Sequence, residues 1–332
     1  MRVSGLSWCL LGLGVWILGL AGCVKPSIPA NIIHDGVHNG GSALAFNQQE
    51  SRLASGGWEG RLHLWSLPDG VRIRSWQAHT GTINGLAYIH EDTILVSAGY
   101  DKRIVFWDRY GQARAVFRVA SPITGMAVDL NRGLLATGHD DGHVTVWQIT
   151  AKPWLERIAQ QRLHKDRVRG LAWHPQHLEL AASSKDGRVM RWRIHSEALE
   201  LPSPSSYARS LVYTQDGRTL IGSGWFRLFH WELEQGQLRE IPTEHRGIIN
   251  SIEMGGADRY LASISRQTDS SVYFLDPRTG EVVERFQPHD LCGGFVALSP
   301  EGGYMATTGD DASVRIWDLD QRLSKEVINI AP

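Results

Sequence analysis

The sequence predicts an all-β protein whose chain closes into a ring of repeated sheets, and three observations lead to this fold class. A tryptophan, replaced once by leucine, recurs at positions 65, 107, 147, 192, 231, 275 and 317, in steps that average 42 residues. A fixed period of this length is typical of repeat architectures. Short β-branched and aromatic runs, bounded by Gly or Asp, surround these positions, as in strands joined by tight turns. The 332 residues also include 35 glycines and 13 tryptophans, which favours the same reading.

The composition excludes several other classes of protein. Hydrophobic residues make up 42% and charged residues 21%, as in a folded chain and not a disordered one. The formal net charge of -1 provides no long-range field for nucleic acid, so we expect no nucleic-acid partner. The three cysteines, Cys9, Cys23 and Cys292, are too few for a disulfide framework or a four-cysteine zinc site.

The first 25 residues have the pattern of an export signal. Arg2 precedes an uncharged stretch from Val3 to Val24, and Lys25 follows it. The stretch ends in Leu20-Ala21-Gly22-Cys23, which resembles the bacterial lipoprotein box. The resemblance implies cleavage before Cys23, which would then carry a thioether-linked diacylglycerol and an amide-linked acyl chain. The alternative is an uncleaved signal anchor, because a stretch of this length can span a bilayer.

Both alternatives place the body of the protein outside the cytoplasm. The lipoprotein resemblance divides the chain into a signal peptide over residues 1–22, a lipidated N-terminus and tether over 23–35, and the ring over 36–332. By analogy with enterobacterial sorting, Val24 after the cysteine favours the outer membrane over the inner membrane. We therefore expect a lipid-anchored protein of the bacterial envelope that faces the periplasm.

The second repeat shows the predicted strands of one module most clearly. They cover residues 82–88, 94–97, 103–107 and 114–119, with a turn at Tyr100-Asp101 between the second and third. Four such strands form one twisted sheet, and only the neighbouring sheets can cover its apolar faces. The repeats must therefore close into a ring, and seven repeats predict seven sheets.

Two further landmarks accompany the tryptophans. An Asp lies six residues before the landmark position five times, and a His lies 27 to 30 residues before it five times. These residues are Asp101, Asp141, Asp186, Asp269 and Asp311, and His38, His79, His164, His245 and His289. The combination resembles the WD-repeat family over residues 36 to about 330. The resemblance implies a seven-bladed β-propeller with four-stranded antiparallel blades.

The resemblance also implies a hydrogen-bonded line within each blade, formed by a loop His, a hydroxyl residue, the turn Asp and the Trp. Charge-assisted hydrogen bonds of this kind join the turns firmly to the strands. Glu59 takes the place of the Asp in the first blade, and the third to sixth blades each lack at least one member. By position, the line is complete in the second and seventh blades, with His79, Ser97, Asp101 and Trp107, and with His289, Thr307, Asp311 and Trp317.

Two segments compete for the outermost strand of the last blade. Residues 326–330 follow the last tryptophan, whereas residues 30–33 stand in the same relation to His38. The resemblance implies closure by an N-terminal strand, but the sequence leaves both alternatives open.

Basic and aromatic residues indicate where a partner would bind. Between Glu156 and Arg193, nine basic residues face four acidic ones. In the family, residues that flank the first strand of a blade, and the residue before the turn Asp, line a rim that binds partners. The alternative is an ordinary solvated surface, because charges at strand edges also discourage edge pairing. The resemblance implies a candidate rim of Trp58, Tyr100, Arg167, Arg169, Lys185, Tyr207 and Arg209.

The sequence contains no motif for catalysis, phosphate binding or haem attachment. The repeat explains five of the fourteen histidines, so we expect no catalytic, cofactor-binding or metal residues. These observations predict a non-catalytic scaffold that binds an acidic or extended segment of another envelope protein, with no small-molecule substrate. The alternative is an extracytoplasmic enzyme or cofactor protein with a metal or quinone in its channel, since residues 275–281 resemble a turn of quinoprotein-type propellers.

Overall fold

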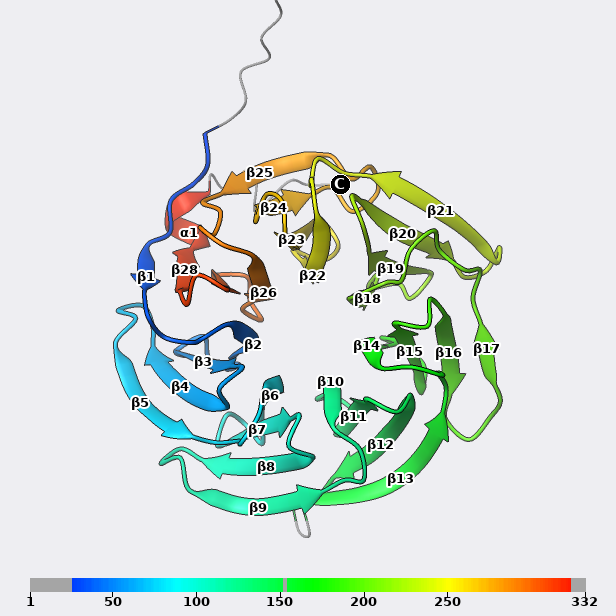
Figure 1. Cartoon of the computed structure of the whole chain (residues 1–332), viewed down its shortest axis with the longest axis horizontal. Helices are drawn as coiled ribbons and strands as arrows, with labels where there is room; N and C mark the ends of the chain where they lie inside the picture. The colour runs from blue at the N-terminus through cyan, green and yellow to red at the C-terminus, as the bar shows by residue number, and fades with distance from the viewer. Residues whose placement is uncertain (1–25, 152–153, 324–332) are drawn as a thin grey trace, which may run out of the picture.

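The computed structural model describes residues 26–151 and 154–323, and it confirms the predicted fold class. Seven four-stranded antiparallel sheets, called blades here, surround a central opening (Figure 1). The innermost strand of each blade lines the opening, and the fourth strand lies at the outer circumference of the ring. The signal peptide predicted over 1–22 and the predicted lipidation site, Cys23, lie outside the described residues.

The strands of the first three blades follow the order of the chain from the centre outward. Blade 1 contains β2 (Gly41–Phe46), β3 (Arg52–Gly57), β4 (Arg61–Ser66) and β5 (Arg72–Gln77). Blade 2 contains β6 (Ile83–Ile89), β7 (Ile94–Gly99), β8 (Arg103–Asp108) and β9 (Ala113–Arg118). Blade 3 contains β10 (Ile123–Asp129), β11 (Leu134–His139), β12 (His143–Ile149) and β13 (Leu155–Arg162).

The next three blades repeat this order. Blade 4 contains β14 (Val168–Trp173), β15 (Glu179–Ser184), β16 (Val189–Arg193) and β17 (Ala198–Glu200). Blade 5 contains β18 (Leu211–Tyr213), β19 (Thr219–Ser223), β20 (Arg227–Glu232) and β21 (Gln237–Pro242). Blade 6 contains β22 (Ile248–Gly255), β23 (Tyr260–Arg266), β24 (Val272–Leu275) and β25 (Val282–Phe286).

Blade 7 is completed by an N-terminal strand, one of the two alternatives that the sequence left open. It contains β26 (Gly293–Leu298), β27 (Tyr304–Gly309), β28 (Val314–Asp318) and, on the outside, β1 (Ile32–His34). β1 runs antiparallel to β28, with Ile32 opposite Ile316 and His34 opposite Val314. The ring thus includes residues before 36, which the sequence had assigned to the tether. The competing segment, 326–330, lies outside the described residues.

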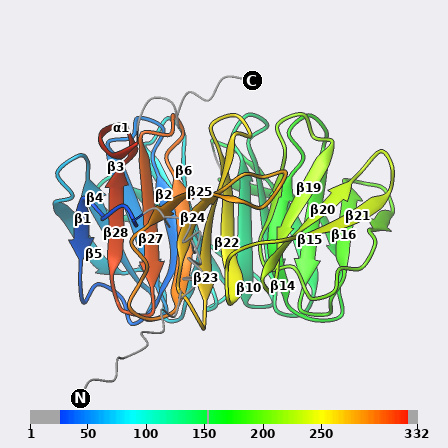
Figure 2. The same ribbon diagram turned by 90° about the horizontal axis from the view of Figure 1, so that it is seen from above.

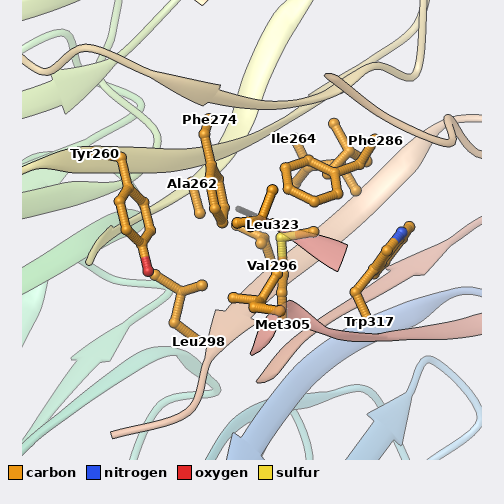
Figure 3. Packing of buried hydrophobic residues seen from close by; sticks show 12 residues of the cluster. Tyr260, Ala262, Ile264, Phe274, Phe286, Val296, Leu298, Met305, Trp317 and Leu323 are labelled. Atoms are coloured by element: carbon orange, nitrogen blue, oxygen red, sulfur yellow. The ribbon is translucent and has the colours of Figure 1, made fainter. Parts of the chain in front are cut away.

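Aromatic side chains between blades form much of the core. Between blades 6 and 7, Tyr260 stacks on Phe274, Phe274 meets Phe286, and Phe286 meets Trp317, with ring centroids 4.1, 4.6 and 5.8 Å apart (Figure 3). Full burial of one such side chain contributes about 1.5–3 kcal/mol. Because each blade covers the next one, a single repeat could not bury these faces alone.

The ring has two faces, which are the two ends of the strands (Figure 2). The innermost strands begin at what we call the leading face, where the turns between the second and third strands also lie. They end at the trailing face, which carries the short helix α1 (Leu319–Arg322) after β28. Among the described residues, no helix is long and apolar enough to cross a membrane.

Glycine is required where a turn of one blade touches the next blade. Gly60, with φ of +76°, follows the turn acid of blade 1, and its carbonyl accepts the main-chain N–H groups of Ala78 and His79. A Cβ atom on Gly60 would lie 2.2 Å from the carbonyl oxygen of His79. Gly142 repeats this arrangement against His164, at 2.1 Å. These close contacts pack each turn against the segment that leads to the next blade, and only glycine fits there.

Candidate functional site

The hydrogen-bonded line of blade 2 joins four side chains from four parts of the blade. The imidazole of His79 lies 2.8 Å from Asp101 Oδ1 and 2.7 Å from Ser97 Oγ, and Trp107 donates its indole N–H to Ser97 Oγ at 2.8 Å. Burial opposes ionisation of Asp101, but hydrogen bonds from His79 and the Thr80 N–H hold its pKa well below the ordinary range. The line therefore stabilises the turn that carries Tyr100.

Blade 1 has the same line with a glutamate in place of the aspartate. His38 lies 2.7 Å from Glu59 Oε1 and 3.0 Å from Ser55 Oγ, and Trp65 donates to Ser55 Oγ at 3.0 Å. Burial raises the pKa of Glu59, but the hydrogen bond and charge of His38 together with main-chain N–H groups outweigh it, and the pKa lies below the ordinary value. The longer side chain thus replaces the aspartate without loss of the contact.

Blade 7 departs from the expected line at its tryptophan. His289 lies 2.9 Å from Asp311 Oδ1 and 2.8 Å from Thr307 Oγ1. The indole N–H of Trp317 is donated to the main-chain carbonyl of Ile28, 3.1 Å away, and not to Thr307. The reason is the N-terminal segment, which runs along the outside of this blade and presents a carbonyl group to the indole.

One group of potential metal ligands occurs among the described residues. Ligand atoms of His38, Glu59 and His63 all lie within 4.8 Å of one another. His38 and Glu59 are already hydrogen-bonded to each other and to the rest of the blade 1 line. His63 is buried, neither of its ring nitrogens has a hydrogen-bond partner, and burial lowers its pKa to about 4. The hydrogen-bonded line therefore already uses two of the three ligands.

A cavity of about 920 Å³ occupies the trailing end of the central channel. Its walls are the second halves of the innermost strands and the turns that follow them. The acidic residues among its described lining are Glu253, Asp258 and Glu301, and this lining includes no histidine. Glu253 accepts the N–H of Leu298 at 2.9 Å, and burial raises its pKa to about 7.

The candidate rim residues all lie at the leading face. Trp58, Tyr100 and Lys185 are exposed, and each is the residue before a turn acid. Their main-chain N–H groups donate to carbonyls at the start of the innermost strands: Trp58 to Gly40, Tyr100 to Thr82 and Lys185 to Arg167. Arg167, Arg169, Tyr207 and Arg209 lie at or beside the start of the innermost strands of blades 4 and 5.

Long side chains connect blades that are not neighbours. The guanidinium of Arg167 in blade 4 lies 5.5 Å from the ring centroid of Tyr100 in blade 2, and it donates to the Tyr100 hydroxyl at 3.2 Å. Between them, Asp140 of blade 3 forms an ion pair with Arg167. In blade 5, Arg209 lies 5.9 Å from the ring centroid of Tyr207. The structure thus brings four of the candidate rim residues into two cation–π pairs.

Three residues of this face were missed by the sequence reasoning. Arg266 at the end of β23 lies 5.5 Å from the ring centroid of Trp58 in blade 1, and it donates to Asp310 Oδ2 of blade 7 at 2.7 Å. Asp140 and Asp310 precede turn acids just as Trp58 does, so the positional rule that selected Trp58 could have found both. No such rule reaches Arg266, since blade 6 has an irregular turn after β23.

Comparison with known families supports the repeat structure. The WD domain, G-beta repeat (WD40) matches residues 33–66, 70–108, 111–148, 156–193 and 280–318, which together make up more than half of the chain. Each segment runs from the outermost strand of one blade through the first three strands of the next, which belong to blades 1, 2, 3, 4 and 7.

Individual relatives have low but extended similarity to this chain. Target of rapamycin complex subunit wat1 of Schizosaccharomyces pombe is 25% identical over 236 residues, which cover 68% of this chain and 74% of that protein. WD repeat-containing protein 55 of Arabidopsis thaliana is 20% identical over 296 residues, 86% of this chain and 82% of that protein. Striatin-4 of Homo sapiens is 23% identical over 279 residues, 74% of this chain but only 37% of striatin-4.

Proposed function

Because this chain belongs to the WD domain, G-beta repeat family, we propose that it is a rigid, non-catalytic platform that docks another protein on its leading face. The observation that carries this proposal is the set of three arginine–aromatic pairs on that face, which are Arg167 with Tyr100, Arg209 with Tyr207, and Arg266 with Trp58. Arg, Tyr and Trp dominate the binding energy of protein interfaces. Since the pairs already order these side chains, they lose less rotamer entropy when a partner docks.

The relatives support a role in assembly. The protein wat1 is named as a subunit of a complex, and this chain covers 74% of its length. A ring of packed blades also suits docking, because it holds the side chains of several blades at fixed separations. The partner we propose is another protein of the bacterial envelope, which offers an acidic or extended segment to the basic side of the face.

We further propose that the platform is held at a membrane through Cys23 and faces the periplasm, with the outer membrane favoured over the inner membrane. Support comes from the uncharged stretch of residues 3–24 and from Leu20-Ala21-Gly22-Cys23. Each buried methylene of an acyl chain contributes about 0.8 kcal/mol, so several chains hold a protein firmly to a bilayer. A membrane anchor also raises the effective concentration of a partner in the same membrane.

Metabolic labelling tests the anchor. The full chain, expressed in a bacterial host with labelled palmitate, is expected to carry the label, and Cys23→Ala is expected to lose it. Cys292→Ala serves as the matched control and keeps the label. Labelled Cys23→Ala protein would contradict acylation at Cys23 without bearing on the docking face.

Charge reversal tests the docking face. In the full chain, Arg167→Glu, Arg169→Glu and Arg209→Glu together are expected to abolish a crosslinked, co-purifying partner while the circular dichroism spectrum stays unchanged. The control combines Arg72→Glu, Arg74→Glu and Arg114→Glu, which reverse exposed arginines on the outermost strands β5 and β9. Equal capture of the partner by both triple variants would contradict docking at this face.

A further inference from the structure

A belt of hydrogen bonds joins neighbouring blades at the start of the innermost strands. In blades 1, 2, 3 and 6, one residue bulges out of the pairing between the first two strands, and its side chain donates to a main-chain carbonyl of the next blade. Ser42 donates to Ile83 at 2.6 Å, Asn84 to Ile123 at 2.8 Å, Thr124 to Val168 at 2.8 Å, and Asn250 to Gly294. Each bond links two neighbouring blades and stabilises the ring.

Arginines occupy this position in blades 4 and 5. The strand register identifies the position, because Leu171 opposite Ala182 and Leu211 opposite Gly222 correspond to Leu86 opposite Ser97, and Leu86 lies two residues after the bulge of blade 2. Arg169 and Arg209 therefore lie at the bulge, and the residues that follow them donate to hydroxyls of the second strand, Gly170 to Ser183 Oγ at 2.9 Å and Ser210 to Ser223 Oγ at 3.2 Å. Among the hydrogen bonds of the described residues, neither arginine side chain donates to the next blade. The Nε atom of Arg169 is buried without a partner.

The two arginines also lack the acids that balance their neighbours. Arg167 is paired with Asp140, and Arg266 with Asp310. Each of these aspartates lies immediately before the turn aspartate of its blade. The same place is taken by Lys185 in blade 4 and by Gly224 in blade 5, where a Cβ atom would lie 2.4 Å from the Phe229 ring. Within the described part of the chain, Arg169 and Arg209 therefore form no salt bridge.

The local electrostatics agree with a positive charge that is only partly compensated. Burial lowers the pKa of Arg169 and the charge of Arg167 acts in the same direction, while the weaker effects of Tyr207, Asp166 and Asp140 oppose it. Burial also lowers the pKa of Arg209, where the nearby Tyr207 opposes the effect but the charges of Arg169 and Arg266 add to it. The guanidinium groups remain charged at neutral pH. An incoming anion would relieve this repulsion.

We propose that Arg169 and Arg209 form a carboxylate-binding site at the leading end of the central channel, which receives an Asp or Glu side chain of a docked protein. This inference rests on the proposed docking function and names the chemistry of one contact within it. A carboxylate is the group that already satisfies the neighbouring Arg167 and Arg266. Guanidinium forks bind carboxylates through paired hydrogen bonds, which are stronger than neutral ones.

Peptide binding tests this site directly. The probe is a capped glycine peptide with a short run of aspartates, titrated into the full chain in detergent and followed by calorimetry. A matched peptide with asparagines is expected not to bind. Arg169→Gln and Arg209→Gln, each made separately, are expected to weaken binding of the acidic peptide by about tenfold or more, because each removes charge-assisted hydrogen bonds to the carboxylate.

Two control variants keep the test sharp if one substitution disturbs folding. Arg72→Gln removes an exposed arginine of β5 and is expected to leave binding unchanged. Arg209→Lys keeps the charge but loses the fork, so binding weakens less than in Arg209→Gln. Equal peptide affinity for the wild type, Arg169→Gln and Arg209→Gln would overturn the site. Direct binding of inorganic phosphate, measured by the same calorimetry, without binding of the acidic peptide would overturn the choice of carboxylate.

The site and the docking function can fail separately. If Arg169→Gln and Arg209→Gln capture the crosslinked partner as the wild type does, and the peptide does not bind, the carboxylate site is wrong and docking stands. If the peptide binds through both arginines but the leading face captures no protein, the docking function is wrong and the anion site stands.

Discussion

Trp317 donates its indole N–H to the main-chain carbonyl of Ile28 at 3.1 Å, across 289 positions of sequence. The same carbonyl accepts the N–H of Gln287 at 2.9 Å, and the N–H of Ile28 donates to Arg285 at 2.8 Å. The N-terminal segment thus binds the outer edge of blade 6 before it forms β1 on blade 7. This connection closes the ring across the boundary between the last two blades.

Trp317→Phe is expected to reduce the free energy of unfolding by about 1–3 kcal/mol, because it leaves the Ile28 carbonyl with one bond fewer and removes buried volume. Urea unfolding at neutral pH measures the change. Trp58→Phe, at an exposed position of the leading face, should change the free energy by less than about 0.5 kcal/mol. Equal stability of Trp317→Phe and the wild type would contradict this role of the contact.

Asp101→Asn is expected to destabilise the protein by roughly 1.5–3 kcal/mol at pH 7, because the carboxylate accepts charged hydrogen bonds in blade 2. The folded-state pKa of Asp101 lies below that of the unfolded chain, which is about 3.9. Its contribution is therefore present above about pH 4 and is lost as the pH falls through the folded-state pKa.

Urea unfolding at a series of pH values checks the sign of this effect. The difference between the wild type and Asp101→Asn should shrink steadily as the pH is lowered from 4 toward 2. A difference that is the same at pH 7 and pH 2 would show that charge plays no part in the line of blade 2.

His63 should produce a separate pH dependence at higher pH. Its folded-state pKa of about 4 lies below the value of about 6.5 in an unfolded chain, so below pH 6.5 the unfolded state binds the proton first. Stability should thus fall as the pH drops from about 6.5 to about 4. His63→Val places a valine where blade 2 has Val105. This variant should lose less stability than the wild type between pH 6.5 and pH 4.

The remaining loss in that range is expected from the other histidines whose pKa burial lowers, among them His230, with a pKa of about 4, and the buried His139, His164 and His245. Unfolding midpoints at pH 7, 5.5 and 4.5 provide the comparison. An identical slope for the wild type and His63→Val would mean that His63 takes up its proton equally in the folded and unfolded chains.

Arg169→Asn should raise stability while it removes a binding group. The asparagine could donate to blade 5 as Asn84 and Asn250 donate to their neighbours, and it removes a positive charge beside Arg167 and Arg209. We expect a gain of about 1 kcal/mol in the free energy of unfolding, together with loss of acidic-peptide binding. Asn84→Ala, which breaks a belt bond, should lose a similar amount. Destabilisation by Arg169→Asn would contradict the assignment of position 169 to the belt.

The seven blades could be predicted because each repeat carries its own strands and turns within about 42 residues. The contacts of His79 and His38 lie within single modules, so their positions follow from the repeat. The choice between two closing strands depended on the relative stability of two distant pairings, which periodicity does not encode. The bond from Trp317 to Ile28 follows from that choice and could not be anticipated.

Contacts between blades that are not adjacent could not be predicted from the sequence for a different reason. Arg266 reaches Trp58, and Arg167 reaches Tyr100, because long side chains extend over the leading face between blades that are not adjacent. The register of a repeat gives the place of a residue in its blade, but it does not show which side chain of a distant blade that residue contacts. The belt position of Arg169 and Arg209 became visible only when the bulges and their hydrogen bonds were compared among blades.

Photo-crosslinking from single positions of the full chain, in bacterial cells, tests docking at the leading face most directly. A benzoylphenylalanine in place of Trp58 lies on the leading face, and one in place of Tyr110, which is also exposed, lies on the turn between β8 and β9 at the trailing face. We expect a discrete crosslinked protein from position 58 and none from position 110. A crosslink from position 110 alone, or equal crosslinks from both positions, would contradict the account.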